Sequence, residues 1–242
     1  MKEFRVRVES LGDSAAIIYG SAAGEWADPQ VRAADARQLI SQRISGVTEV
    51  ATAFESLSIY YDCHRVSFQE VQAWILAVLS RHQSSGDMSN STKRIEIPVC
   101  YDERSGLDLQ SLSEFLQMSQ AEIIERHSNA EYRVQMIGFS PGFPYLSGLP
   151  EELHIPRRST PRMRVPAGSV AIAGNQAGIY PNDSPGGWHI VGRTNLPLFD
   201  VSRTPPCLLQ AGDVVRFVPI TSHQFETLSN APETAQWPES TS

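Results

Sequence analysis

Positive charge gathers in one stretch of an otherwise acidic chain. The sequence holds 20 lysine and arginine residues against 27 aspartate and glutamate residues, a formal net charge of −7. Between His154 and Arg193 the balance reverses, because five arginines face the single acid Asp183, a local charge of 5 − 1 = +4. A guanidinium is a planar fork that binds carboxylate or phosphate through two hydrogen bonds. This arginine-rich stretch (residues 154–193) is therefore a candidate anion site.

Prolines divide the first part of the arginine-rich stretch. Pro156, Pro161 and Pro166 favour an extended backbone, on which Arg162 and Arg164, two residues apart, face the same way. The alternative is a solvated or salt-bridged loop. Residues 156–170 contain four arginines and no acid, so ion pairing would require distant partners. We therefore favour a clamp for an anion.

Glycines and an aromatic ring follow in the second part of the stretch. Gly186 and Gly187 offer a backbone whose N–H groups can cradle an anion, and Trp188 adds a broad ring face. Side chains with hydrogen-bonding groups stand nearby in the sequence. The predicted set of substrate- and anion-binding residues is Arg157, Arg162, Arg164, Ser169, Gln176, Tyr180, Ser184, Gly186, Gly187, Trp188 and Arg193.

The segment GFSPGFPYL, residues 138–146, predicts a fixed loop at the end of a strand. Its prolines reduce the entropy of the loop, and its glycines allow a ligand to approach the backbone closely. We expect it to form a pocket wall, although a plain cover over a barrel mouth would have the same composition. The predicted wall residues are His127, Phe139, Pro141, Gly142 and Phe143. For His127, near a helix end before a strand, a cap or core contact is the more usual role.

Several familiar sites are missing from the sequence. There is no G-x-x-x-x-G-K-[ST] phosphate loop and no G-x-G-x-x-G after the first predicted strand. The six histidines lack H-x-x-x-H spacing, so no metal site is expected. Ser169 and Ser184 do not lie in G-x-S-x-G, and no general base is evident. The catalytic residues therefore remain unassigned.

Composition narrows the class of protein. The acidic balance argues against a nucleic-acid partner. No apolar run approaches the length of a membrane span, and the first residues show no signal segment, so no membrane association is expected. Three cysteines without a C-x-x-C pair favour a reducing cytoplasm.

Periodicity predicts an α+β architecture. Strands are expected over 4–8, 15–19, 47–53 and 57–61, with helices from 29 to about 44 and from 68 onward. The resulting β-β-α-β-β-α order, with a further strand over 94–100, is typical of a small ferredoxin-like α/β domain. A polar linker over 83–92 follows the second helix. We assign this N-terminal domain to residues 1–90.

The second half changes in texture. Short helices are predicted over 107–116 and 121–127, and nine of the 16 glycines and eleven of the 16 prolines then fall between Gly138 and Pro206. Short apolar runs over 132–137, 169–173, 189–191, 196–199 and 213–218 lie between these turn residues, which indicates a β-barrel or sandwich. We assign this domain to residues 95–220 and expect a poorly ordered polar tail over 221–242.

These segments together resemble the family of the 5-oxoprolinase B subunit, also called the KipI or allophanate hydrolase subunit 1 family. Weaker similarities occur at GDS (12–14), GV (46–47), SL (56–57) and YD (61–62). The specific matches, in unbroken order, are ERHS (125–128), YRV (132–134), GFSPGFPYL (138–146), the run over 156–194, LFD (198–200), PP (205–206) and QAGDVVRFVP (210–219). One departure is Leu107 in Gly-Leu-Asp-Leu, where the family has proline.

The resemblance implies a cyclophilin-like β-barrel in the C-terminal domain. It also implies a subunit of an ATP-dependent 5-oxoprolinase that opens 5-oxoproline to L-glutamate. Such a subunit is active only with a second barrel subunit of the C type and a third subunit of the A type. ATP is the cofactor implied. Two alternatives remain open within the resemblance: a non-catalytic inhibitor of a histidine kinase, and a carboxyl-transfer partner in urea or allophanate metabolism.

Overall fold

The computed structural model describes residues 6–20, 28–82 and 93–229, and the chain divides into two compact units, Met1–Ser91 and Thr92–Ser242. The N-terminal unit contains the elements β1 (Val6–Ser10), β2 (Ala15–Gly20), α1 (Pro29–Ser41), β3 (Val47–Thr52), β4 (Ser56–Tyr61) and α2 (Phe68–His82). The predicted β-β-α-β-β-α order is thus confirmed.

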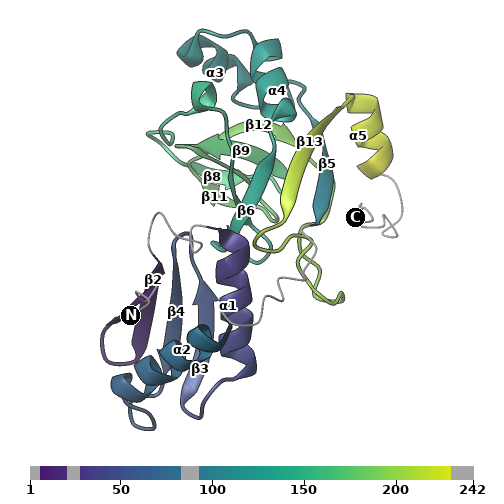
Figure 1. Cartoon of the computed structure of the whole chain (residues 1–242). Coiled ribbons are helices and arrows are strands. Elements are labelled where there is room, and N and C mark those ends of the chain that lie inside the picture. The colour runs from purple at the N-terminus through teal and green to yellow at the C-terminus, as the bar shows by residue number, and fades with distance from the viewer. Residues whose placement is uncertain (1–5, 21–27, 83–92, 230–242) are drawn as a thin grey trace. The chain divides into compact units, whose positions relative to one another are not determined.

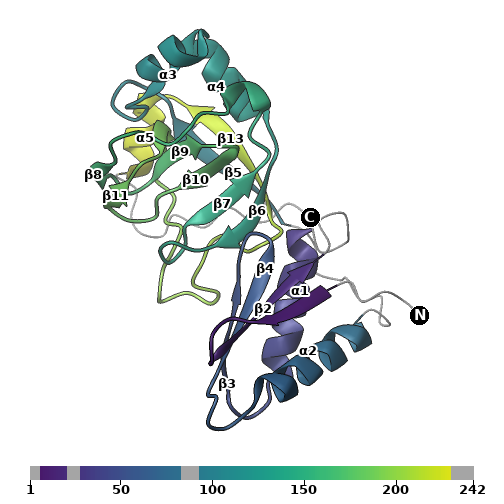
Figure 2. The same ribbon diagram turned by 90° about the vertical axis from the view of Figure 1, so that its left-hand side faces the viewer.

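The N-terminal sheet is antiparallel with strand order β1-β2-β4-β3, and both helices cover one of its faces (Figures 1 and 2). Its core is mainly aliphatic and includes the fully buried Ile18, Leu57 and Ile75. Local signals set the helix starts. Asp28 accepts a hydrogen bond from the backbone of Gln30 before α1, and Glu70 accepts one from the backbone of Ser67 before α2.

The C-terminal unit is built on a closed barrel of seven strands in the order β10-β7-β6-β13-β5-β12-β9. These strands are β5 (Arg94–Cys100), β6 (Tyr132–Ile137), β7 (Pro144–Ser147), β9 (Ser169–Ala173), β10 (Gln176–Ile179), β12 (His189–Arg193) and β13 (Val214–Ile220). The predicted α+β class with a β-barrel is therefore confirmed. Alternate residues such as Ile95, Ile97 and Val99 of β5 join the main hydrophobic core.

Further elements surround the barrel. The helices α3 (Leu109–Leu116) and α4 (Gln120–Asn129) lie over one end (Figures 1 and 2), with α4 beginning at a Ser119–Glu122 capping box, as the sequence predicts. A short 3₁₀ turn, η2 (Glu151–Leu153), follows β7. The strands β8 (Arg162–Val165) and β11 (Ser184–Gly186) pair only with each other, as a separate two-stranded sheet.

The structure corrects three expectations. The strand over 94–100 does not extend the N-terminal sheet, because β5 pairs in parallel with β13 along its whole length. Residues 196–199 form no strand; an isolated bridge joins Phe199 to Cys207 instead. The predicted disordered tail begins with a helix, α5 (Ser222–Ser229), where Thr221 and Gln224 form hydrogen bonds at the first turn. The rest of the tail, and the linker over 83–92, lie outside the described residues.

Candidate functional site

A cluster of aromatic side chains packs against the outer side of the barrel strands β9, β10 and β12, on the face opposite the main core. The rings come from β7 and from residues next to β7, β10 and β12. Ala171 and Ala173 of β9 belong to this cluster, whereas Val170 and Ile172, which alternate with them, belong to the barrel core. Val165 of β8 packs onto the same cluster. The small β8–β11 sheet therefore covers an outer face of the barrel.

Phe143 is at the centre of this aromatic face. Its ring centroid lies 4.9 Å from that of Tyr145, 5.2 Å from that of Tyr180 and 5.7 Å from that of Trp188. Gly178 of β10 makes this packing possible, because a Cβ there would lie 2.8 Å from the Phe143 ring and 3.0 Å from the Trp188 ring. We call these four rings, together with Phe139, the aromatic face.

The loop over 138–143 raises one ring into solvent. Phe139 is 62% exposed and has a φ of 66°, a left-handed conformation that bulky side chains rarely adopt. Hydrogen bonds hold it there: the Gly138 N–H donates to the Phe143 carbonyl, and the Phe143 N–H to the Ser140 carbonyl. Strain at an exposed aromatic residue is typical of functional sites.

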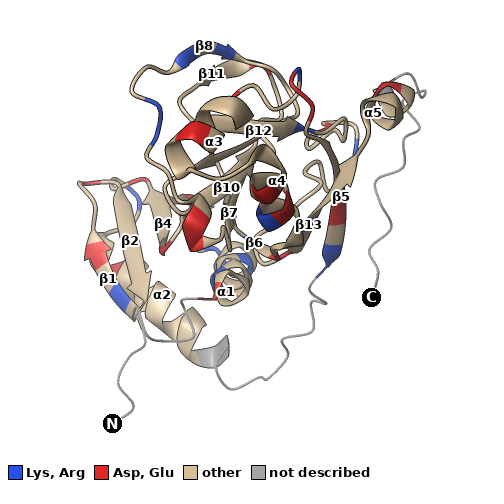
Figure 3. Cartoon of the chain, turned by 90° about the horizontal axis from the view of Figure 1, so that it is seen from above, with Lys and Arg blue, Asp and Glu red and all other residues tan. Residues whose placement is uncertain are grey.

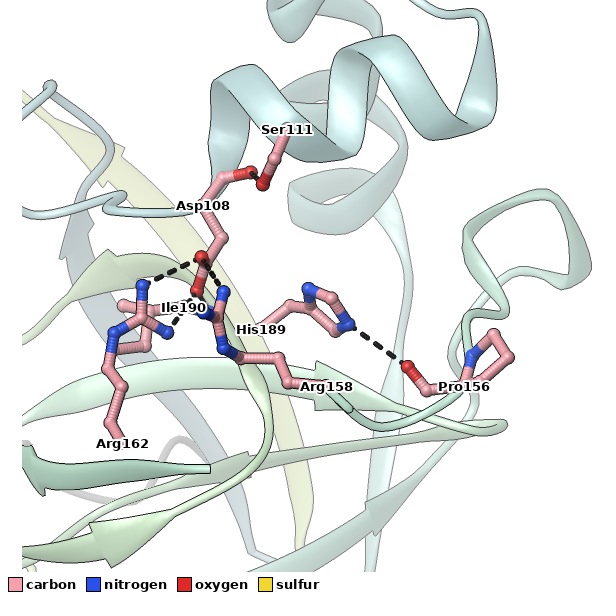
Figure 4. Close-up of polar contacts among 7 residues, drawn as sticks. All are labelled: Asp108, Ser111, Pro156, Arg158, Arg162, His189 and Ile190. Atoms are coloured by element: carbon pink, nitrogen blue, oxygen red, sulfur yellow. Dashed lines mark hydrogen bonds and ion pairs between the residues drawn. The ribbon is translucent and has the colours of Figure 1, made fainter. Parts of the chain in front are cut away.

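Two arginines of the arginine-rich stretch bind one buried carboxylate (Figure 4). Arg162 reaches Asp108, just before α3, through two hydrogen bonds of 2.8 Å, and Arg158 adds one of 2.6 Å. The backbone N–H of Ile190 donates a fourth, of 2.7 Å. Asp108 therefore ties the loop and strand that carry these arginines to both α3 and β12.

The charge of Asp108 results from opposing effects. Burial raises the pKa of its carboxyl, but hydrogen bonds from Arg162 and the Ile190 N–H, together with the charges of Arg162 and Arg158, bring the pKa below its ordinary value. The carboxylate is therefore ionised at neutral pH. The alternative to an anion clamp was a salt-bridged loop whose arginines have distant acidic partners. Asp108 is such a partner for Arg158 and Arg162.

The other arginines of the stretch have separate partners. Arg164 donates to Asp183 over 2.7 Å, and Asp183 also accepts the Ala167 N–H. Arg193 donates to the Ala167 carbonyl. Arg157 makes no ion pair within the described chain and lies over the ring of Trp188, 5.9 Å from its centroid. Figure 3 shows the basic residues of β8 and the neighbouring loop on the same side of the unit.

The serines and glycines of the predicted binding set are mostly used within the chain and do not form an open cradle of N–H groups for an anion. Ser169 donates to the Pro166 carbonyl, and the Ser184 oxygen is buried without a partner among the described residues. A Cβ at Gly186 would clash with the Tyr180 hydroxyl, so this glycine allows a ring to approach. The Gly187 carbonyl accepts a hydrogen bond from the Arg158 N–H. Gln176 starts β10 and is half-buried.

Tyr180 links the aromatic face to the arginines. Burial raises the pKa of its phenol, while a hydrogen bond with the Trp188 backbone and the charges of Arg157 and Arg162 lower that pKa in part. The phenol is therefore neutral. Tyr180, Phe139 and Phe143 come together as the sequence suggested, with Gly142 packed on Leu198 and Phe199 behind the loop.

His127 is placed elsewhere. Its ring contacts are with Tyr101, Tyr132 and Phe217 in the barrel core, not with the 138–143 loop. It is fully buried, and burial lowers its pKa to about 3. The part of the chain that the structure describes contains no group of three or more histidine, cysteine or acidic side chains able to hold a metal ion. No described helix is long and apolar enough to cross a membrane.

Similar proteins identify the family. The chain is 40% identical over 240 residues to the B subunit of 5-oxoprolinase from Bacillus subtilis, covering 93% of this chain and 99% of that protein. It is 45% identical over 188 residues to the B subunit of 5-oxoprolinase from Haemophilus influenzae, with 76% and 83% covered. This chain belongs to the family of the 5-oxoprolinase B subunit. Residues 6–209 also match the family model of the carboxyltransferase domain, subdomain C and D.

More remote similarities show how widely this fold is used. The crystal structure of TTHA0988 matches with a TM-score of 0.72 at 32% identity, over 88% of this chain but only 40% of that longer protein. A urea amidolyase of Lachancea kluyveri is 24% identical over 221 residues, which are 80% of this chain and 12% of that protein. The fold of this family thus also occurs within longer chains.

The residue that organises the arginines is not among those that the sequence predicts for the site. Asp108 stands out in the sequence only as part of Gly-Leu-Asp-Leu at the start of a helix. Arg158 belongs to the basic stretch but not to the predicted binding set, and Tyr145, a ring of the aromatic face, is absent from the predicted wall. The usable signal for Asp108 is an acid in a segment that departs from the family pattern only at Leu107, but the partners of Asp108 are 50 and 54 residues away.

Proposed function

We propose that this chain is the B subunit of an ATP-dependent 5-oxoprolinase and acts only together with partner subunits. The observation that carries the proposal is the 40% identity to the B subunit of a 5-oxoprolinase along 99% of that protein's length. The partners would be a second barrel subunit of the C type and a third subunit of the A type. Three unpaired cysteines support a cytoplasmic location.

The chemistry of the reaction fits an incomplete site. Opening the lactam of 5-oxoproline breaks a stable amide, and we expect ATP to activate the amide oxygen by phosphorylation before water adds to the ring carbon. Both reactants are anions, and an arginine-rich surface is suited to them. Asp108 and Asp183 are bonded to arginines of this stretch, which makes them unsuited to act as a general base. A partner subunit would supply the base.

Reconstitution tests this proposal directly. The chain is produced alone and with the A-type and C-type subunits, and L-glutamate and ADP are measured with 5-oxoproline and ATP. We expect equal formation of both products in the full set and none from the single chain. Robust lactam opening by the chain alone, or none by the full set, would contradict the proposal.

Carboxyl transfer is the second candidate, favoured by the carboxyltransferase family model over residues 6–209. It predicts that the chain with its natural partners consumes a carboxylated biotin carrier in the presence of urea. The same purified complex can be assayed for both reactions. Loss of carboxyl-biotin without glutamate formation would select this candidate over 5-oxoprolinase.

A further inference from the structure

The arginines between residues 154 and 193 are not equivalent. Arg158 and Arg162 are held by Asp108, Arg164 by Asp183, and Arg193 by the Ala167 carbonyl. Within the described chain, Arg157 alone in this set donates no hydrogen bond and forms no ion pair; its contact is with the ring of Trp188. Arg157 is exposed, so its N–H donors face solvent. One guanidinium of the stretch is therefore available to an external anion.

The neighbours of Arg157 hold it in place. The next residue, Arg158, is fixed twice, by its backbone N–H on the Gly187 carbonyl at 2.9 Å and by its guanidinium on Asp108. Trp188 beneath Arg157 is only 5% exposed. A guanidinium above an aromatic ring is attracted through its flat face, and its N–H groups at the edge stay free for a planar carboxylate. The arrangement thus limits the entropy that Arg157 would lose on binding.

The surroundings discriminate between kinds of anion. The charge of Arg157 lowers the pKa of the Tyr180 phenol, which places the guanidinium near that ring. The centroid of the Tyr180 ring lies 6.3 Å from that of the exposed Phe139 ring. Arg157 and the exposed Phe139 ring lie on the same aromatic face, where Arg157 lies over Trp188 and Phe139 contacts Phe143 and Tyr180. One free cation and one exposed ring on a shared face match a small molecule with a single carboxylate and an apolar ring. A triphosphate would need several free cations, whereas Arg158, Arg162 and Arg164 already bind carboxylates.

We propose that Arg157 is the residue of this chain that recognises the carboxylate of a small cyclic monoanion. Under the proposed function, on which this inference rests, that molecule is 5-oxoproline. Arg157 then acts in substrate specificity and not in ATP binding. Phe139 lies on the apolar side of the same subsite. Arg158 and Arg162 position the segment that carries Arg157 through their bonds to Asp108.

The test compares Arg157→Gln with wild type in the complex with the A-type and C-type subunits. We expect the KM for 5-oxoproline to rise about tenfold to a hundredfold, the loss typical of one charge-assisted hydrogen-bonding side chain, while the KM for ATP stays unchanged. Arg157→Lys retains the charge without the planar fork and should fall between them. Arg216→Gln, at an exposed arginine on β13, is the matched control and should behave as wild type.

Binding without turnover provides the second measurement. Calorimetry of the complex without ATP should show that wild type binds 5-oxoproline more tightly than 2-pyrrolidinone, which lacks the carboxylate, and that Arg157→Gln removes this preference. Wild-type KM and preference in Arg157→Gln, or a rise confined to the KM for ATP, would overturn this inference alone. Absence of turnover in the wild-type complex would instead overturn the proposed function.

Discussion

The C-terminal unit contains two clusters of aromatic side chains, one buried in the barrel core and one partly exposed on its outer face. The inner cluster, Tyr101, His127, Tyr132 and Phe217, lies in the barrel core, where none of its members is more than 9% exposed. The aromatic face lies on the outside of β9, β10 and β12. There Phe139 is 62% exposed and Arg157 lies over Trp188.

The polar groups of the two clusters explain the difference. In the inner cluster Tyr101 and His127 share a hydrogen bond of 2.9 Å, and the Tyr132 hydroxyl donates to the His127 carbonyl at 3.0 Å. Burial raises the pKa of both tyrosines and lowers that of His127, so all three stay neutral. These groups bond to one another and stabilise the fold. The aromatic face instead leaves a cation and a ring edge open to a ligand.

The largest expected contrast is between two phenylalanine truncations. Phe217→Ala removes a fully buried ring and should lower the free energy of unfolding by about 3–5 kcal/mol. Phe139→Ala removes an exposed ring and should change stability by less than about 0.5 kcal/mol, while reducing 5-oxoproline turnover in the complex. Urea unfolding and the reconstituted assay measure the two effects. Equal destabilisation by both variants would contradict the distinction between the clusters.

Removing the carboxylate under the arginines should be nearly as damaging. Asp108→Ala leaves two guanidinium groups and the Ile190 N–H without their acceptor, and we expect a loss of about 3 kcal/mol in unfolding free energy. Because Arg158 and Arg162 remain partly exposed, water recovers some of the cost.

A double-mutant cycle separates the ion pair from general damage near α3. Asp108→Ala combined with Arg162→Gln should cost clearly less than the sum of the single changes, since one stranded charge is removed. Additive losses measured by urea unfolding would show that Asp108 does not act through Arg162.

The sequence predicted the elements better than their assembly. Alternating apolar residues and capping boxes located most strands and helices, because these signals are local. The Asp108–Arg162 pair could not be found this way, since 54 residues separate its members and only barrel closure brings them together. The same reason hides the partner of β5 within the barrel, because that strand pairs with β13 at the far end of the chain.

The sequence predicted those parts of the candidate site that local signals define and missed those that depend on long-range contacts. The GFSPGFPYL loop and Tyr180 converge because each carries its own turn or strand signal next to the aromatic residues. His127 was listed with the wall of that loop, with a core contact as the alternative, and α4 directs it to the barrel core beside Phe217, as the alternative has it. Periodicity did not indicate whether the His127 ring on α4 would face the barrel core or the loop over 138–143.

His127 gives the inner cluster a dependence on pH that the aromatic face should lack. Its pKa is about 3 in the folded chain against an ordinary value near 6.5, so between these values the unfolded chain binds one more proton. The contribution of the neutral, buried His127 to the free energy of unfolding is therefore fully present above about pH 6.5, and it is lost progressively as the pH is lowered toward 3. From pH 6.5 to 5 the loss should be about 1.5 kcal/mol.

Comparison of a His127 variant with wild type at the same two pH values separates this contribution from those of the other titrating groups. His127→Gln, which can still accept a hydrogen bond from Tyr101, should remove this part of the pH dependence when unfolding free energies are compared at pH 6.5 and 5. His223→Gln, at a solvent-facing histidine, is the matched control variant. An unchanged slope in His127→Gln would mean that the buried ring is already protonated at pH 5.

The smallest effect is expected where an arginine of the stretch is paired at the surface. Arg164 and Asp183 have side chains that are 78% and 43% exposed, in contrast to the 3% of Asp108. An ion pair in water contributes little and weakens with salt, so Arg164→Gln should leave the free energy of unfolding close to that of wild type. Substrate kinetics of the complex should stay close to wild type, because Arg164 already binds a carboxylate of its own chain. A tenfold rise in the KM for 5-oxoproline in Arg164→Gln would show that this pair opens to receive the substrate, and that Arg157 is not the only cation of the stretch that does so.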